Sequence, residues 1–137
     1  MEAVNLNQST RSIFNLLRIT FSVVPIVAGL DKFTDILTHW EDYLNPSIAG
    51  ILPFSPHTFM MIAGVIEITA GIIVLIKPAI GGLIVAAWLT LIALTLLTGG
   101  IHLDVAVRDL VMAIGAFSLA RISRSVLYVN SKMNEEF

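Results

Sequence analysis

The run FMMIAGVIEITAGIIVLI, residues 59–76, decides the fold of this chain. It is apolar and close to the length of about 20 residues that a membrane-spanning helix needs. Its one ionisable side chain is Glu67. A charge near the centre of a bilayer costs at least a few kcal/mol, so such a residue usually faces other helices or a water-filled cavity. We therefore expect Glu67 to be buried inside a bundle of helices.

Small residues on the same helical face support this orientation. Gly64 and Gly71 lie three and four residues from Glu67, a spacing that places all three on one side of a helix. Glycines on such a face let a neighbouring helix approach closely. We expect both glycines to be helix-packing positions.

The composition indicates a membrane protein. Of the 137 residues, 56% are hydrophobic and 13% are charged, whereas soluble domains are about a quarter charged. The net charge of −2 does not favour nucleic-acid binding. Because the chain has no cysteine, it cannot itself form disulfides or hold an iron–sulfur cluster through cysteines.

Four apolar segments predict an all-α, integral membrane four-helix bundle, formed by residues 1–137 as a single transmembrane domain. Lys77-Pro78 is a clear helix stop between the second segment and the third. No A-x-A-like cleavage site follows the first segment, so we expect it to be retained. The predicted spans cover residues 16–37, 59–76, 79–97 and 104–122.

The long connection after the first span, residues 38–58, predicts a short interfacial segment. Trp40 and Tyr43 favour the headgroup level of a membrane. Leu37, Trp40 and Leu44 also follow a helical stripe. An ordinary surface loop with an aromatic anchor remains the alternative.

The distribution of charge predicts the orientation in the membrane. Basic residues prefer the cytoplasmic side, and with four spans they gather on the side that carries both termini. We therefore expect both termini to be cytoplasmic. The basic side has Arg11, Arg18, Lys77, Arg121, Arg124 and Lys132, and the opposite side has Asp31, Asp35, Glu41, Asp42 and Asp104.

A group of ionisable side chains is expected to form a buried polar pocket between the midplane and the outer surface. Glu67 is the deepest member of this group. Arg108 is placed to pair with the acids of the pocket, or with Asp104 four residues before it. Burial and neighbouring negative charge disfavour the ionised form of an acid, so we expect one acid to be protonated, with Glu67 as the candidate, and we expect Glu67 or Asp109 to handle a proton. The expected pocket residues are Asp31, Lys32, Glu67, Arg108 and Asp109.

The last span repeats the pattern of small residues. Asp109 shares a helical face with Ala113 and Ala116, which we expect to be further helix-packing positions. This face predicts a close approach of the second and fourth spans. Trp88, in the third span, is expected to pack.

The pocket has two interpretations. Buried ion pairs can fix the register of helices without taking part in chemistry. Alternatively, the pocket receives a quinone headgroup, a proton or a small solute. A metal or haem site is not indicated, because no H-x-x-x-H pair exists and the three histidines fall in or beside the outer connections: His39, His57 and His102.

Short motifs along nearly the whole chain carry a family resemblance. They are Leu17-Arg18, Ala28-Gly29-Leu30-Asp31-Lys32-Phe33, the proline-containing connection, Gly64-Val65-Ile66-Glu67-Ile68-Thr69-Ala70-Gly71 and Val107-Arg108-Asp109-Leu110. With these motifs the chain resembles the DoxX/DoxX-like family of small four-span membrane proteins. The resemblance implies a membrane subunit with redox or metal-handling partners, since the family's namesake is similar to a subunit of a thiosulfate:quinone oxidoreductase.

Three functions follow as expectations. The preferred one is a membrane or accessory subunit of a quinone-linked, respiratory-type electron-transport complex in a bacterial or archaeal cytoplasmic (inner) membrane. The alternatives are a structural assembly subunit and a small-solute transporter or exporter component. Whether the chain is itself an enzyme stays open, because it has no redox-cofactor motif. Expected partners are the lipid bilayer, other membrane or redox subunits and quinone, with no covalently bound cofactor.

Overall fold

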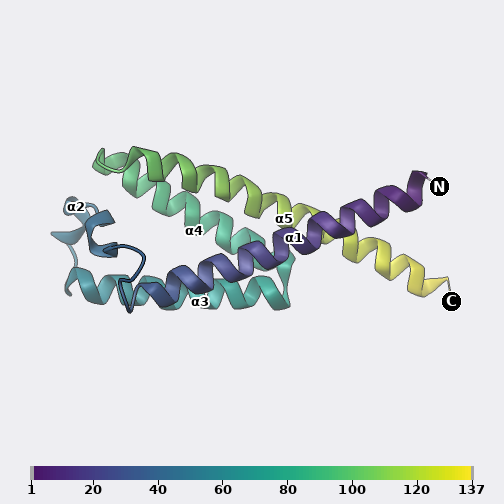
Figure 1. Cartoon of the computed structure of the whole chain (residues 1–137), viewed down its shortest axis with the longest axis horizontal. Coiled ribbons are helices and arrows are strands. Elements are labelled where there is room, and N and C mark those ends of the chain that lie inside the picture. Colours follow the sequence, from purple (N-terminus) through teal and green to yellow (C-terminus); the bar gives the residue numbers. More distant parts are fainter. Residues whose placement is uncertain (1, 137) are drawn as a thin grey trace.

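The computed structural model describes residues 2–136, with side chains from residue 7 onward, and it is all-helical. Helix makes up 84% of the structure, and the described residues form no strand. The connection after the first long helix, where the sequence predicted one short interfacial segment, contains two short helices: η1 (Trp40–Tyr43) and α2 (Pro46–Ala49). The four long helices are α1 (Glu2–Asp31), α3 (Pro56–Ile76), α4 (Pro78–Gly99) and α5 (Leu103–Glu135) (Figure 1).

Local sequence signals place the ends of α3 and α4. The Ser55 hydroxyl caps α3 by accepting a hydrogen bond from the backbone N–H of Thr58. Pro78 starts α4 directly after Lys77 closes α3, since proline suits the first turn of a helix. Gly100 ends α4 with a φ of 70°, a left-handed conformation that glycine adopts at low cost.

The first helix ends earlier than the predicted span of residues 16–37. It stops at Asp31, whose carboxylate accepts hydrogen bonds from the backbone N–H groups of Ile36 and Leu37 at 3.0 and 3.1 Å. These bonds fold the chain back over the helix end, so the apolar residues that follow do not extend α1.

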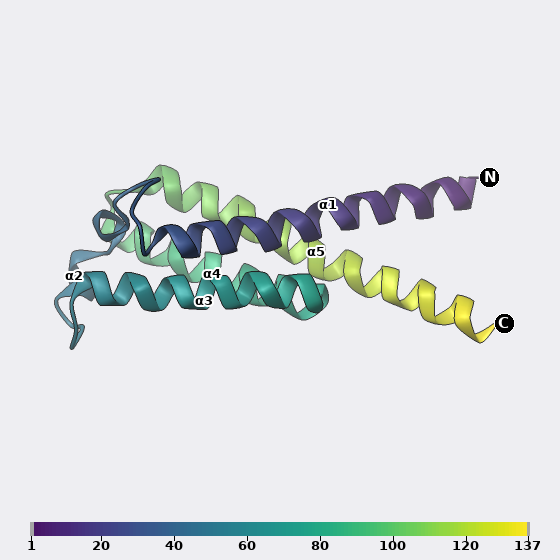
Figure 2. The same ribbon diagram turned by 60° about the horizontal axis from the view of Figure 1, so that its bottom comes forward.

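The long helices pack as two pairs, with α1 along α3 and α4 along α5 (Figures 1 and 2). Glycine makes the first pair possible, because a Cβ on Gly29 would lie 2.6 Å from the Gly64 carbonyl oxygen. A Cβ on Gly71 would lie equally close to the Ser22 carbonyl oxygen. The Ser22 hydroxyl also donates a hydrogen bond of 2.9 Å to the Gly71 carbonyl.

Small residues line the contact within the second pair. A Cβ on Gly82 of α4 would lie 2.8 Å from the Ala116 carbonyl oxygen of α5, and Ala113 and Ala116 are both buried. The prediction that the small-residue faces of the second and fourth spans pack against each other is therefore wrong. Gly64 and Gly71 face α1, and the small-residue face of α5 meets α4.

Among the residues that the structure describes, three helical segments are long and apolar enough to cross a membrane: Asn7–Asp31, Pro56–Ile76 and Pro78–Gly99. Apolar side chains stay exposed along their outer faces, as contact with lipid requires. The apolar part of α5 is shorter, because charged residues bound it at Asp109 and Arg121. The larger cluster of buried apolar residues draws on all four long helices and contains Phe14, Phe21, Ala70, Val74, Val85, Ala116 and Leu119. A second, smaller cluster, Ala93, Leu96 and Ala106, lies between α4 and α5.

The two ends of the chain lie at the same end of the bundle, where α1 and α5 extend beyond the α3–α4 turn (Figures 1 and 2). Arginine side chains of α1 help to hold this end together. The Arg18 guanidinium donates to the carbonyl of Leu75 in the last turn of α3, and Arg11 Nη2 donates to Asn130 Oδ1 at 3.0 Å. We call this the terminal end and the opposite one the connection end.

Candidate functional site: a buried ion pair between two tryptophans

A buried ion pair joins the end of α1 to the middle of α3. Lys32 Nζ lies 2.7 Å from Glu67 Oε2, and the two side chains are 6% and 10% exposed. This is the length of a charge-assisted hydrogen bond. The close approach depends on Gly64, because a Cβ there would lie 3.2 Å from Lys32 Cβ. Glu67 is therefore buried, as predicted, and Lys32 is the cation that pairs with it.

Trp88 binds the second oxygen of the same carboxylate. Its indole N–H donates to Glu67 Oε1 at 3.2 Å. Because Trp88 belongs to α4, this bond links the α1–α3 pair to the α4–α5 pair. Each oxygen of the Glu67 carboxyl group therefore has its own partner, Lys32 on Oε2 and Trp88 on Oε1. The sequence indicated only packing for Trp88, since an apolar helical context does not tell where an indole N–H points.

Trp40 closes over the ion pair from the connection. The Lys32 ammonium lies 3.7 Å from the centroid of the Trp40 ring, well inside the range of a cation–π contact. The Trp40 indole N–H donates to Asp31 Oδ2 at 2.8 Å. Asp31 therefore binds the connection, at Trp40 and at the backbone of residues 36 and 37. It does not take part in the Lys32–Glu67 pair.

Asp109 lies beside the ion pair without joining it. It is half-buried on α5, close enough to Lys32, Glu67 and Arg108 for their charges to act on its carboxylate. Within the part of the chain that the structure describes, its side chain makes no hydrogen bond. Arg108 is exposed, and the expected pair with Asp104 is not among the ion pairs of the described residues, which are Lys32–Glu67 and His57–Glu41.

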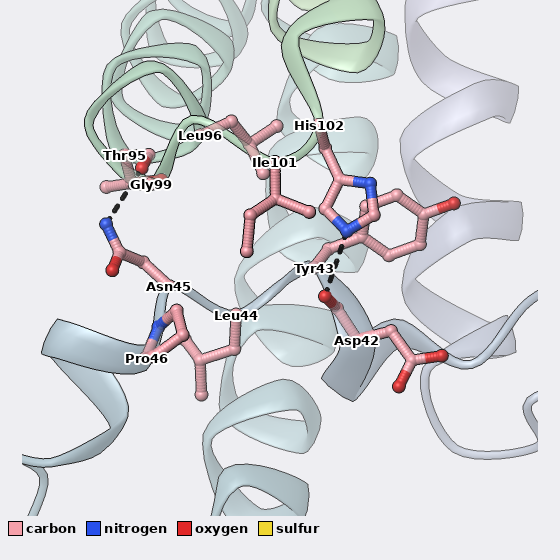
Figure 3. Close-up of a pocket in the computed structure, with 10 residues that line it drawn as sticks. All are labelled: Asp42, Tyr43, Leu44, Asn45, Pro46, Thr95, Leu96, Gly99, Ile101 and His102. Carbon is pink, nitrogen blue, oxygen red and sulfur yellow. Dashed lines mark hydrogen bonds between the residues drawn. The ribbon is translucent and has the colours of Figure 1, made fainter.

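A small cavity lies at the connection end, where η1 and α2 meet the turn between α4 and α5 (Figure 3). The Tyr43 and His102 rings are 4.4 Å apart, and His102 Nε2 lies 3.1 Å from the Asp42 carbonyl oxygen. Asn45 Nδ2 donates to the Thr95 carbonyl at 3.1 Å. The volume of about 10 Å³ is near that of a single water site, so these residues fasten the connection to the bundle.

A wider apolar groove of about 850 Å³ runs along the outside of α4 and α5. It is separate from the ion pair: Leu91 and Leu94 line it from α4, and Ile114 and Phe117 line it from α5. Lys32 and Glu67 themselves are buried by their neighbours.

The arrangement combines one closed ion pair with one acid, Asp109, that stays open to a further partner. The described residues contain no group of three or more His, Asp and Glu side chains placed to hold a metal ion. Because Lys32 and Glu67 bind each other, they can position helices, whereas the Asp109 carboxyl group can hold a proton or accept a hydrogen bond. Comparison of the chain with protein-family models, with curated proteins and with solved structures finds no match.

Proposed function

We propose that the chain is an integral membrane subunit of a quinone-linked redox complex, the function that the resemblance to the DoxX-like family implies. One observation carries the proposal: Asp109 is a half-buried acid, without a hydrogen bond in the described structure, beside the closed Lys32–Glu67 pair. Ionisable groups at membrane depth tend to mark sites of function, because burying them is costly. Lys32 and Glu67 neutralise each other, so the free acid is the group available for chemistry.

The proposed placement has four spans, with α5 crossing beside α4 and both termini in the cytoplasm of a bacterium or archaeon. The shared position of both chain ends supports it (Figures 1 and 2). Arg18 and Lys77 also lie together near the end of α3, as the positive-inside rule requires. At a rise of about 1.5 Å per residue, Glu67 lies roughly 15 Å from Lys77, half the thickness of the hydrocarbon core.

The residues of α5 fit a quinone headgroup chemically. A bound quinone supplies the capacity to take up two electrons and two protons, and its carbonyl oxygens need hydrogen-bond donors. The exposed Arg108 guanidinium is a donor of that kind. The neighbouring Asp109 carboxyl would hold a proton beside it. Electrons would have to come from a redox subunit, because this chain has no cysteine and no redox-cofactor motif.

Purification in mild detergent tests the proposal. The tagged chain is expected to retain a redox-active membrane subunit and quinone. Arg108→Gln is expected to lower the quinone content and keep the partner, whereas Lys132→Gln, an exposed basic residue at the terminal end, is expected to change neither. Recovery of the chain with neither a redox subunit nor quinone would contradict the proposal.

A second candidate is a purely structural subunit that holds a larger membrane assembly together. The closed Lys32–Glu67 pair and the tight Gly29–Gly64 contact favour it, since both position helices without leaving a group free. In that case, enlarging Gly64 disperses the complex, whereas replacing Asp109 by asparagine changes nothing. The effect of replacing Asp109 by asparagine therefore distinguishes the two candidate functions.

A further inference from the structure

The Lys32–Glu67 pair is buried, yet on the side of the connection one aromatic ring covers it. Lys32 directly follows the last residue of α1 and is only 5% exposed. Trp40 is the side chain of the connection that covers its ammonium group, at 3.7 Å from the ring centroid. We propose that Trp40 is a lid, whose movement opens the ion pair to the aqueous phase at the connection end. This proposal does not depend on the proposed function.

Three kinds of contact hold the lid: the bond from Trp40 to Asp31, exposed polar contacts of its neighbours, and the packing of Tyr43 against the buried residues Ala93, Leu96 and Ala106. No residue of η1 is fully buried. Glu41 Oε1 pairs with His57 Nδ1 of α3 at 3.0 Å, and both side chains are about half exposed. The turn before α5 is also in contact with η1: the His102 ring lies against the Tyr43 ring, and its Nε2 is within hydrogen-bond distance of the Asp42 carbonyl oxygen (Figure 3). Water competes for exposed polar contacts, so the Glu41–His57 pair and the bond between His102 and the Asp42 carbonyl can break and form again at little cost.

Movement of the segment between α1 and η1 breaks the bonds from the backbone of Ile36 and Leu37 to Asp31, but it unwinds no long helix. Residues 32–39 form turns and bends only. Asp35 has a φ of 50°, a left-handed conformation that aspartate adopts in turns more readily than most other side-chain-bearing residues. By contrast, α3 beneath the lid is packed against α1 through Gly64 and Gly71.

The absence of cysteine from the chain allows a direct test. A single cysteine is introduced by Met60→Cys, at a buried position of α3 one turn from Gly64 toward the connection. The matched control is Val74→Cys, buried in the core near the terminal end of the same helix. Each is combined with Trp40→Ala or Trp40→Phe in the full chain in proteoliposomes, and reaction with a water-soluble thiosulfonate is timed.

The lid predicts a local effect. Trp40→Ala should raise the reaction rate at Met60→Cys by at least about tenfold and leave the rate at Val74→Cys unchanged. Trp40→Phe, which keeps a ring over Lys32 but lacks the indole N–H, should give an intermediate rate. An unchanged rate at Met60→Cys would overturn the proposal. So would an equal rise at both positions, because Trp40 would then support the whole bundle.

Discussion

Lys32 Nζ and Glu67 Oε2 are 2.7 Å apart, and this contact connects the end of α1 to the middle of α3. Trp40 covers the cation, and Trp88 donates to the second oxygen of the carboxylate. Every charge of the pair is therefore matched inside the protein. The pair differs in this respect from Asp109, which is near enough to feel both charges and is bonded to neither.

Removal of one partner should be more harmful than removal of both. Lys32→Met or Glu67→Met alone leaves a buried charge unpaired, which costs about 3–5 kcal/mol in the free energy of unfolding. The double variant Lys32→Met/Glu67→Met should recover most of that loss. Unfolding in mixed micelles measures all three variants. If the double variant loses as much as the two single losses combined, the pair does not act as a unit.

Gly64 should tolerate no larger residue. The Cβ of Gly64→Ala would lie 2.6 Å from the Gly29 carbonyl oxygen, so α1 and α3 must separate. We expect a loss of about 1–3 kcal/mol in the free energy of unfolding, as for other overpacked cores. Gly50→Ala is the matched control, because its Cβ meets nothing closer than 3.6 Å. Equal stability of the two variants would show that the helix pair does not depend on Gly64.

The sequence was sufficient to predict which face of α3 is buried, but not what covers it. Glu67, Gly64 and Gly71 recur with the helical period, and that period alone predicts one inward face. The partner helix depends on tertiary packing, so the expected approach of the second and fourth spans was replaced by the α1–α3 pair. The contact from Trp88 to Glu67 also joins separate helices, and local sequence contains no signal for it.

Trp88 should stabilise Glu67 through its indole N–H and not only through its size. Trp88→Phe keeps an aromatic ring but leaves Glu67 Oε1 without this donor. A hydrogen bond to a charged group contributes about 1.5–3 kcal/mol, so we expect a loss of stability in that range. The same substitution in the Lys32→Met/Glu67→Met background, which has no carboxylate, should cost clearly less. An equal loss in both backgrounds would assign the effect to packing.

Both termini should be reached from the cytoplasm. Single cysteines introduced by Ser12→Cys and Ser131→Cys lie at the exposed terminal end, and Ile51→Cys lies in the exposed connection. In intact cells, an impermeant thiol reagent should label Ile51→Cys and should label the other two only after the membrane is opened. Labelling of Ser131→Cys without opening the membrane would show that α5 does not cross it.

Quinone-dependent turnover of the purified complex tests the central claim, that Asp109 is the functional acid, most directly. Asp109→Asn keeps the shape of the side chain but cannot carry the proton. The matched control is Asp104→Asn, an exposed acid near the start of α5. With subunit content equal in both, we predict that Asp109→Asn lowers turnover at least about tenfold, toward the range typical of lost acid–base groups. Asp104→Asn should keep full turnover. Full turnover with Asp109→Asn would contradict the claim.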